Sequence, residues 1–155
     1  MANNPEAQLS DLGLTLPTAS VPVANYVPFV RTGNLVFVAG QLPLEDGQLK
    51  YTGTLGDGVS VETAYEAAKL CGLNLIAQAK AACGGDLGKV TRVVKLTGFV
   101  AGTAGFTDQP KVVNGASDLM VAVFGDAGRH ARAAVGAPSL PRGACVEVEA
   151  VFEVS

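Results

Sequence analysis

The most constraining feature of this sequence is the alternation of its last segment, ACVEVEAVFEV at 144–154. Side chains of a β-strand point to opposite faces in turn, so this pattern predicts a strand with two unlike faces. One face carries Val146, Val148, Ala150, Phe152 and Val154, and the other carries Cys145, Glu147, Glu149, Val151 and Glu153. We expect the apolar row to face helices and the mixed row to face solvent or another subunit.

An apolar hairpin is predicted near the start of the folded region. Two β-branched runs, 27–31 and 35–39, flank the short turn Thr32-Gly33-Asn34. The second run, LVFVA, has no polar alternation and is predicted to be a central strand. Gly40 follows it directly, where a missing side chain lets a ligand or another backbone approach closely.

Two helices and two further strands complete the expected pattern. Ser60 is a suitable N-cap for a helix ending near Cys83, and a second helix is expected from an N-cap at Thr107 to Gly125. Strands are expected at 90–101 and 131–136, besides 144–154.

The order of these elements is hairpin, helix, strand, helix, strand, strand. It predicts an α+β domain with two helices on one face of a mixed sheet and right-handed crossovers. Residues 1–25 are expected to form an N-terminal extension, with one or two helical turns at 5–12, and 26–155 the domain itself. The segment 41–58 is predicted to be a long loop, a kind of segment that is often functional.

Charge and composition limit the partners of this chain. Charged residues make up 16% of it, against roughly a quarter in an average soluble protein, so part of the surface is expected to be buried in a homo-oligomer. The net charge of −3 argues against nucleic acid as the main partner.

Cysteine spacing and hydropathy bear on location and on metals. Cys71, Cys83 and Cys145 are too widely spaced for a disulfide framework or a C-x-x-C metal site, which indicates reduced, buried thiols. The N-terminus lacks the features of a signal peptide, and no apolar run approaches the ~18 residues of a membrane span. We expect a cytoplasmic protein with no metal, no cofactor and no membrane partner.

Several stretches together resemble one known family. These are NYVPFVRTGNLVFVAGQLP near the start, TGFV in the middle, KVVN in the second helix and RHARAAVGAPSLPRGACVEVEAVFEV at the end. They are similar to the reactive-intermediate deaminase family, also called Rid or YjgF, over residues 26–154. The resemblance implies a chorismate-mutase-like α+β fold and a homotrimer with inter-subunit clefts. It also implies hydrolysis of small 2-imino acids, such as 2-iminopropanoate, to 2-oxo acids and ammonia.

The resemblance also assigns roles to individual residues. Arg132 matches the family's carboxylate-binding arginine, and Glu147 matches the glutamate assigned to the water. Tyr26 matches an aromatic residue of the cleft, Gly40 a glycine of the pocket wall, and Asn114 an asparagine that is either structural or part of the pocket.

Two positions depart from the family pattern. Ala134 stands where the deaminases frequently have cysteine, and Ala39 where they often have serine. If position 134 contributes backbone groups to the substrate site, alanine can serve there. With the N-terminal extension, these departures indicate a divergent subgroup.

The residue chemistry agrees with a small carboxylate-bearing substrate. A guanidinium such as that of Arg132 can bind a carboxylate through two parallel, charge-assisted hydrogen bonds, although a surface ion pair is its alternative role. Glu147 could direct a water to the imine carbon or return a proton to the departing nitrogen. Imines of this type hydrolyse unaided, so positioning can suffice. His130, the only histidine, is interpreted as structural.

Three other functions compete with the deaminase. One is a non-catalytic trimeric module that binds or senses small 2-oxo acids. Another is an endoribonuclease, which the acidic balance disfavours. The third is a chorismate mutase with Arg129, Arg132 and Arg142 as its cationic cluster, which the closing motif disfavours.

Overall fold

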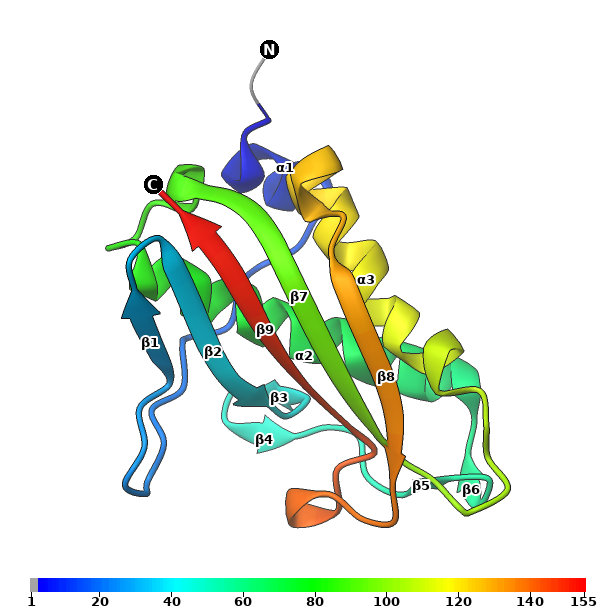
Figure 1. Cartoon of the computed structure of the whole chain (residues 1–155). Helices are drawn as coiled ribbons and strands as arrows, with labels where there is room; N and C mark the ends of the chain where they lie inside the picture. The colour runs from blue at the N-terminus through cyan, green and yellow to red at the C-terminus, as the bar shows by residue number, and fades with distance from the viewer. Residues whose placement is uncertain (1–2) are drawn as a thin grey trace.

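The computed structural model describes residues 3–155, which form a five-stranded sheet with helices on one face (Figure 1). The helices are α1 (Pro5–Asp11), α2 (Val61–Ala82) and α3 (Gln109–Phe124). The strands of the large sheet are β1 (Phe29–Thr32), β2 (Leu35–Gln41), β7 (Val90–Ala101), β8 (Ala131–Ala137) and β9 (Val146–Val154). The predicted α+β class and the order of its main elements are therefore confirmed.

The sheet is mixed and runs in the order β1-β2-β9-β7-β8. Only the pair β7 and β8 is parallel, while β1–β2, β2–β9 and β7–β9 are antiparallel. The chain passes from β7 to β8 through α3, as a parallel pair requires a crossover. In this strand order, β8 forms one edge of the sheet and β1 forms the other.

The alternation of β9 divides the sheet into a buried and an open face, as predicted. The apolar row from Val146 to Val154 is buried beneath α2 and α3, with Phe152 fully buried and tilted against Phe124 of α3. No helix of residues 3–155 covers the other face, which is turned toward the viewer in Figure 1. We call this side the open face.

Strand β2 explains why LVFVA lacks polar alternation. It is second from the edge, and its burial does alternate, since Val36 and Val38 are buried while Phe37 is 46% exposed on the open face. The predicted central strand is therefore an inner strand of the sheet, paired with β1 and β9 and open on one face. The residue of β2 that points to the open face, Phe37, is thus apolar and exposed. Val30 on β1 and Val135 on β8 are likewise apolar and exposed.

The expected helices form with small differences at their ends. Ser60 caps α2 by accepting a hydrogen bond from the Thr63 amide, and Cys83 is the C-cap. The N-cap of α3 is Asp108 rather than Thr107, and Pro110 lies in the first turn, where its missing N–H costs nothing.

The predicted loop at 41–58 contains short ladders. An antiparallel pair joins β3 (Leu44–Glu45) to β4 (Gln48–Leu49), and a parallel pair joins β5 (Thr54–Leu55) to β6 (Gly58–Val59).

The N-terminal segment packs against the helical layer. Helix α1 lies at the C-terminal end of α3 (Figure 1), where Leu9 is 4% exposed and belongs to the core. Asn3 donates a 2.8 Å hydrogen bond to the Val123 carbonyl, and Glu6 pairs with Lys80 of α2 at 3.1 Å. The division into an extension (1–25) and a domain (26–155) remains a prediction.

Helices α2 and α3 approach each other at small residues. A Cβ added to Gly115 would overlap the Tyr65 carbonyl oxygen and lie 2.9 Å from its carbon. Another added to Gly72 would lie 2.9 Å from Cδ2 of Leu119. The close crossing of the two helices therefore depends on glycine at these positions.

Gly115→Ala is expected to destabilise the protein, because the obstacle is backbone that no rotamer change can move. We expect a loss of about 1–3 kcal/mol in the free energy of unfolding, as for an overpacked core. Urea denaturation measures it. Gly105→Ala is the matched control, since a Cβ there meets nothing within 4 Å. Equal stability of the two variants would contradict the prediction.

The three cysteines are buried, as the sequence predicted. Burial raises the pKa of Cys145 to about 11 and also raises the pKa of Cys71 and Cys83. Because the thiolate is the reactive form, a raised pKa lowers thiol reactivity at neutral and mildly alkaline pH.

We therefore expect the native protein to resist a thiol-specific chromogenic reagent at pH 8. All three cysteines should react once the protein is unfolded in guanidinium chloride. The measurement is the absorbance of the released chromophore with and without denaturant. Rapid labelling of any thiol in the native protein would count against the buried assignment.

Candidate functional site

Arg132 is held at the edge of the sheet by two residues of α3. It lies on β8 opposite Leu96 of β7, a fully buried residue, so its side chain is on the helix side of the sheet. Its Nη1 donates 2.8 Å to Oδ1 of Asn114 and 3.1 Å to Oγ of Ser117. The structure thus brings together two of the site residues that the sequence predicted, Arg132 and Asn114.

One edge of this guanidinium is uncommitted. A guanidinium has five N–H donors, and the two on Nη1 are taken by α3. Within residues 3–155, Nε and Nη2 make no hydrogen bond, and Arg132 has no acidic partner. Arg132 therefore forms no surface ion pair with another of the described residues. Nε and Nη2 together present the parallel pair of donors that suits a carboxylate.

Ser117 is a site residue that the sequence reasoning missed. Its hydroxyl lies 2.8 Å from Nε2 of His130, besides accepting from Arg132. Ser117 and Asn114 are three residues apart, a spacing that places side chains on one face of a helix. That spacing was the one available signal, because serine is unremarkable on a partly exposed helix.

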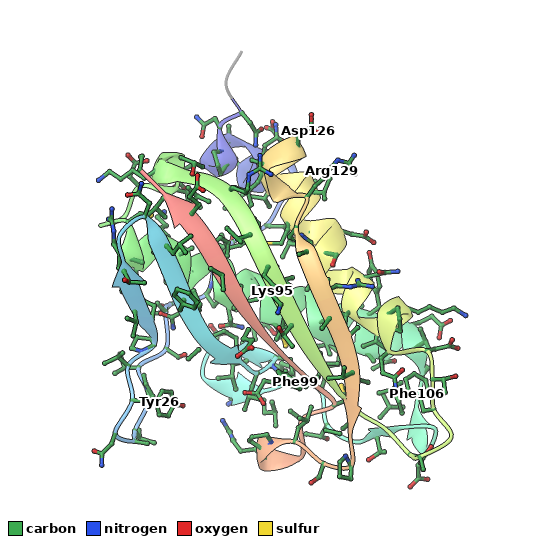
Figure 2. The ribbon with its side chains drawn as sticks, in the orientation of Figure 1. Tyr26, Lys95, Phe99, Phe106, Asp126 and Arg129 are labelled. Atoms are coloured by element: carbon green, nitrogen blue, oxygen red, sulfur yellow. The ribbon has the colours of Figure 1, made fainter. Side chains whose placement is uncertain are left out.

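Glu147 occupies the open face and is half-buried there. It lies opposite Phe99 of β7, whose side chain Figure 2 shows over the same face. Burial raises the pKa of Glu147, and the neighbouring Glu149 raises it further. A carboxyl group whose pKa is raised is better suited to exchange protons near neutral pH.

Gly40 makes room for this carboxyl group. A Cβ at residue 40 would overlap Oε1 of Glu147, and would lie 3.0 Å from Cδ and 3.2 Å from Cγ. A register shift in the β2–β9 ladder between Val38 and Gln41 brings Gly40 to this place. The close approach that the sequence predicted at Gly40 is therefore with the glutamate side chain.

Tyr26 lies on the open face as well, at the opposite margin from β8. It is 59% exposed and lines an apolar hollow of about 590 Å³ beside β1 and β2. Phe37, Ala39, Lys95, Thr97 and Glu149 also line this hollow. Figure 2 shows Tyr26 beside β1 and Lys95 on β7. Gly40 follows the lining residue Ala39, and Glu147 is two residues before the lining residue Glu149, but neither Gly40 nor Glu147 lines the hollow.

Ala134 is on the helix side of β8, two residues beyond Arg132. It lies opposite Gly98 of β7 and is half-buried against the core. A Cβ on Gly98 would overlap Val113 of α3, so the layer is tightly packed here. Ala134 offers no reactive side-chain group, and its contribution to a site is limited to its backbone and its small size.

Arg132 and Glu147 do not share a pocket within one chain. They project from opposite faces of the sheet, and β7 separates their strands. The described residues also contain no group of three or more His, Cys, Asp or Glu side chains that could hold a metal ion. A site that uses both Arg132 and Glu147 requires a second copy of the chain.

Comparisons with known proteins identify the family of this chain. A family model described as "YjgF/chorismate mutase-like, putative endoribonuclease" matches residues 6–153. Protein TCP17 of Trypanosoma cruzi is 48% identical over 150 residues, covering 96% of this chain and 93% of that protein.

Solved structures show the same likeness. A protein of unknown function from Agrobacterium tumefaciens is 52% identical with a TM-score of 0.92, covering 97% of this chain and 92% of its own. RidA from an Antarctic Psychrobacter is 26% identical with a TM-score of 0.60, covering 88% and 94%. In residues 3–155, no helix is long and apolar enough to cross a bilayer. From the family match and the TCP17 identity, the chain belongs to the YjgF/chorismate mutase-like family, as its sequence motifs predicted.

Proposed function

We propose that this protein is an enamine/imine deaminase that hydrolyses small 2-imino acids to 2-oxo acids and ammonia. The observation that carries the proposal is the Arg132 guanidinium, with Nη1 held by α3 and its Nε–Nη2 edge uncommitted. Such an edge can bind the carboxylate that every 2-imino acid carries. The likeness to RidA supports the same activity, whereas the description of the matching family model names a putative endoribonuclease.

The active unit in this proposal is a cytoplasmic homotrimer with clefts between subunits. Arg132 of one subunit would anchor the carboxylate, and Glu147 of a neighbour would face the imine carbon. The separation of these residues within one chain favours such sharing. So do the exposed apolar side chains of the open face, including Phe37, Val30 and Val135. An apolar face of this kind is typical of a surface that another chain covers.

The reaction adds water across the imine bond and then expels ammonia. Glu147 would take one proton from the attacking water and pass it to the imine nitrogen as the C–O bond forms, giving a neutral tetrahedral carbinolamine. It would then take the hydroxyl proton of the carbinolamine and pass it to the nitrogen as the C–N bond breaks, leaving a 2-oxo acid and ammonia. The raised pKa of Glu147 suits both transfers. Tyr26 would close the cleft, with Asn114 supporting Arg132.

A direct assay tests this function. An amino acid oxidase generates the 2-imino acid in situ, and the release of 2-oxo acid is followed with and without the purified protein. We expect acceleration in proportion to protein concentration. If release proceeds at the uncatalysed rate while the protein still binds pyruvate, a non-catalytic binding module is the better description.

The assembly has its own test. Light scattering at micromolar concentration is expected to give three times the chain mass of 15.7 kDa. A monomeric mass would remove the shared cleft.

We do not favour an endoribonuclease, because the net charge of −3 opposes binding to a phosphate backbone.

A further inference from the structure

We infer that Ser117 and His130 are positioning residues that orient the carboxylate anchor Arg132. This inference rests on the proposed function, since it concerns how that site holds its substrate. His130 lies two residues before Arg132, and its ring meets the Ser117 hydroxyl of α3. The same hydroxyl contacts Arg132. Neither residue touches Glu147 or the hollow of the open face.

The hydrogen bonds of His130 determine which ring nitrogen carries the proton. Its Nδ1 lies 2.6 Å from the Gly128 carbonyl oxygen, which can only accept. Nδ1 must therefore be the protonated nitrogen of the neutral ring. That leaves Nε2 as an acceptor, 2.8 Å from the Ser117 hydroxyl.

The direction of the remaining bonds follows from this tautomer. The Ser117 hydroxyl donates its single hydrogen to Nε2 of His130, so a lone pair of Oγ is left to accept from Nη1 of Arg132. Without His130, the same hydroxyl could turn toward a carbonyl of its own helix. His130 thus keeps Ser117 in the orientation that receives the arginine.

Two acceptors on one nitrogen determine the plane of the guanidinium. Both hydrogens of Nη1 lie in that plane, and Asn114 and Ser117 each accept one of them. With Asn114 alone, the group could rotate about the remaining hydrogen bond. With both, the Nε–Nη2 edge has a set direction before substrate arrives, which lowers the entropy that binding must overcome.

Removing the Ser117 hydroxyl should weaken carboxylate binding and leave the chemical step unchanged. The carboxylate is held alike in the bound substrate and in the transition state, so a loss of this contact raises KM with little effect on kcat. For Ser117→Ala we expect KM, and the dissociation constant for pyruvate, to rise roughly tenfold, as for one hydrogen bond to a charged group. His130→Leu should behave similarly.

Conservative variants separate positioning from general structure. Ser117→Thr retains a hydroxyl, and His130→Gln retains an acceptor for it. Both should bind pyruvate within about twofold of the original protein, well inside the tenfold loss expected for one hydrogen bond. Urea denaturation of all four variants shows whether any loss of binding reflects unfolding.

A spectroscopic measurement tests the hydrogen bonds from His130 through Ser117 to Arg132 and does not depend on an activity assay. His130 is the only histidine of the chain, so tag-free ¹⁵N-labelled protein gives one set of imidazole signals. We expect the Nδ1–H tautomer, and a shift of the Nε2 signal in Ser117→Ala.

The outcomes for this inference and for the proposed function are distinct. An Nε2–H tautomer, or an unchanged KM and pyruvate affinity in folded Ser117→Ala, would overturn the positioning role while leaving a working deaminase. A protein that neither accelerates imine hydrolysis nor binds pyruvate would overturn the proposed function and the inference together.

Discussion

Arg132→Ala is expected to reduce imine hydrolysis to the uncatalysed rate. The variant removes the Nε–Nη2 edge, and two charge-assisted hydrogen bonds to a carboxylate correspond to roughly 10²- to 10⁴-fold in kcat/KM. The same oxidase-coupled release of 2-oxo acid measures the loss. Pyruvate binding should disappear with the activity, because both depend on the same anchor.

Two further arginine variants make this prediction specific. Arg129→Ala removes the same charge three residues away, where the side chain is exposed and bonded to Asp126, and it should retain full activity. Arg132→Lys retains the charge without the planar fork and should be intermediate. Wild-type kinetics in Arg132→Ala would mean that the carboxylate binds elsewhere.

Gly40→Ala is expected to be nearly as damaging to catalysis, although it adds a single methyl group. The new Cβ would occupy the place of Oε1 of Glu147 and force that carboxyl group to rotate away. Misplacing a group that transfers protons costs about 10²- to 10⁴-fold in rate. The loss should appear in kcat, with KM little changed, because Arg132 is untouched. Stability should change little, since the displaced atoms belong to the end of a flexible side chain.

A double-mutant cycle identifies the cause of this loss. The three atoms nearest to the added Cβ all belong to Glu147 beyond its own Cβ, so Glu147→Ala removes them. Adding Gly40→Ala to Glu147→Ala should then have no further effect on kcat. A second, independent drop in the double variant would show that Gly40 acts through something other than Glu147.

Much of the fold could be predicted because the signals are local. Ser60 caps α2 as expected, since the cap depends on a serine hydroxyl and an amide three residues along. The alternation of β9 predicted its buried row for the same reason: successive side chains of a strand point to opposite faces wherever the strand lies.

The site was only partly predictable from sequence. Family motifs nominated Arg132 and Asn114, and the structure brings them within hydrogen-bonding distance. The motifs gave no sign of Ser117, whose role depends on how α3 lies against the edge strand β8. The sequence also predicted Thr107 as the cap of α3, whereas the cap is Asp108; both residue types are good N-caps, and backbone geometry decides between neighbouring positions.

The sequence by itself determined which residues could form helices and strands, and which face of each would be apolar. Only the tertiary structure decided that Arg132 lies on the helix side of the sheet and Glu147 on the open face, with β7 between their strands. It alone decided that Gly40 meets Glu147, through an irregularity in the β2–β9 ladder. The physical reason is that side-chain alternation is a property of one strand, whereas register and strand order arise from pairing between segments far apart in the chain.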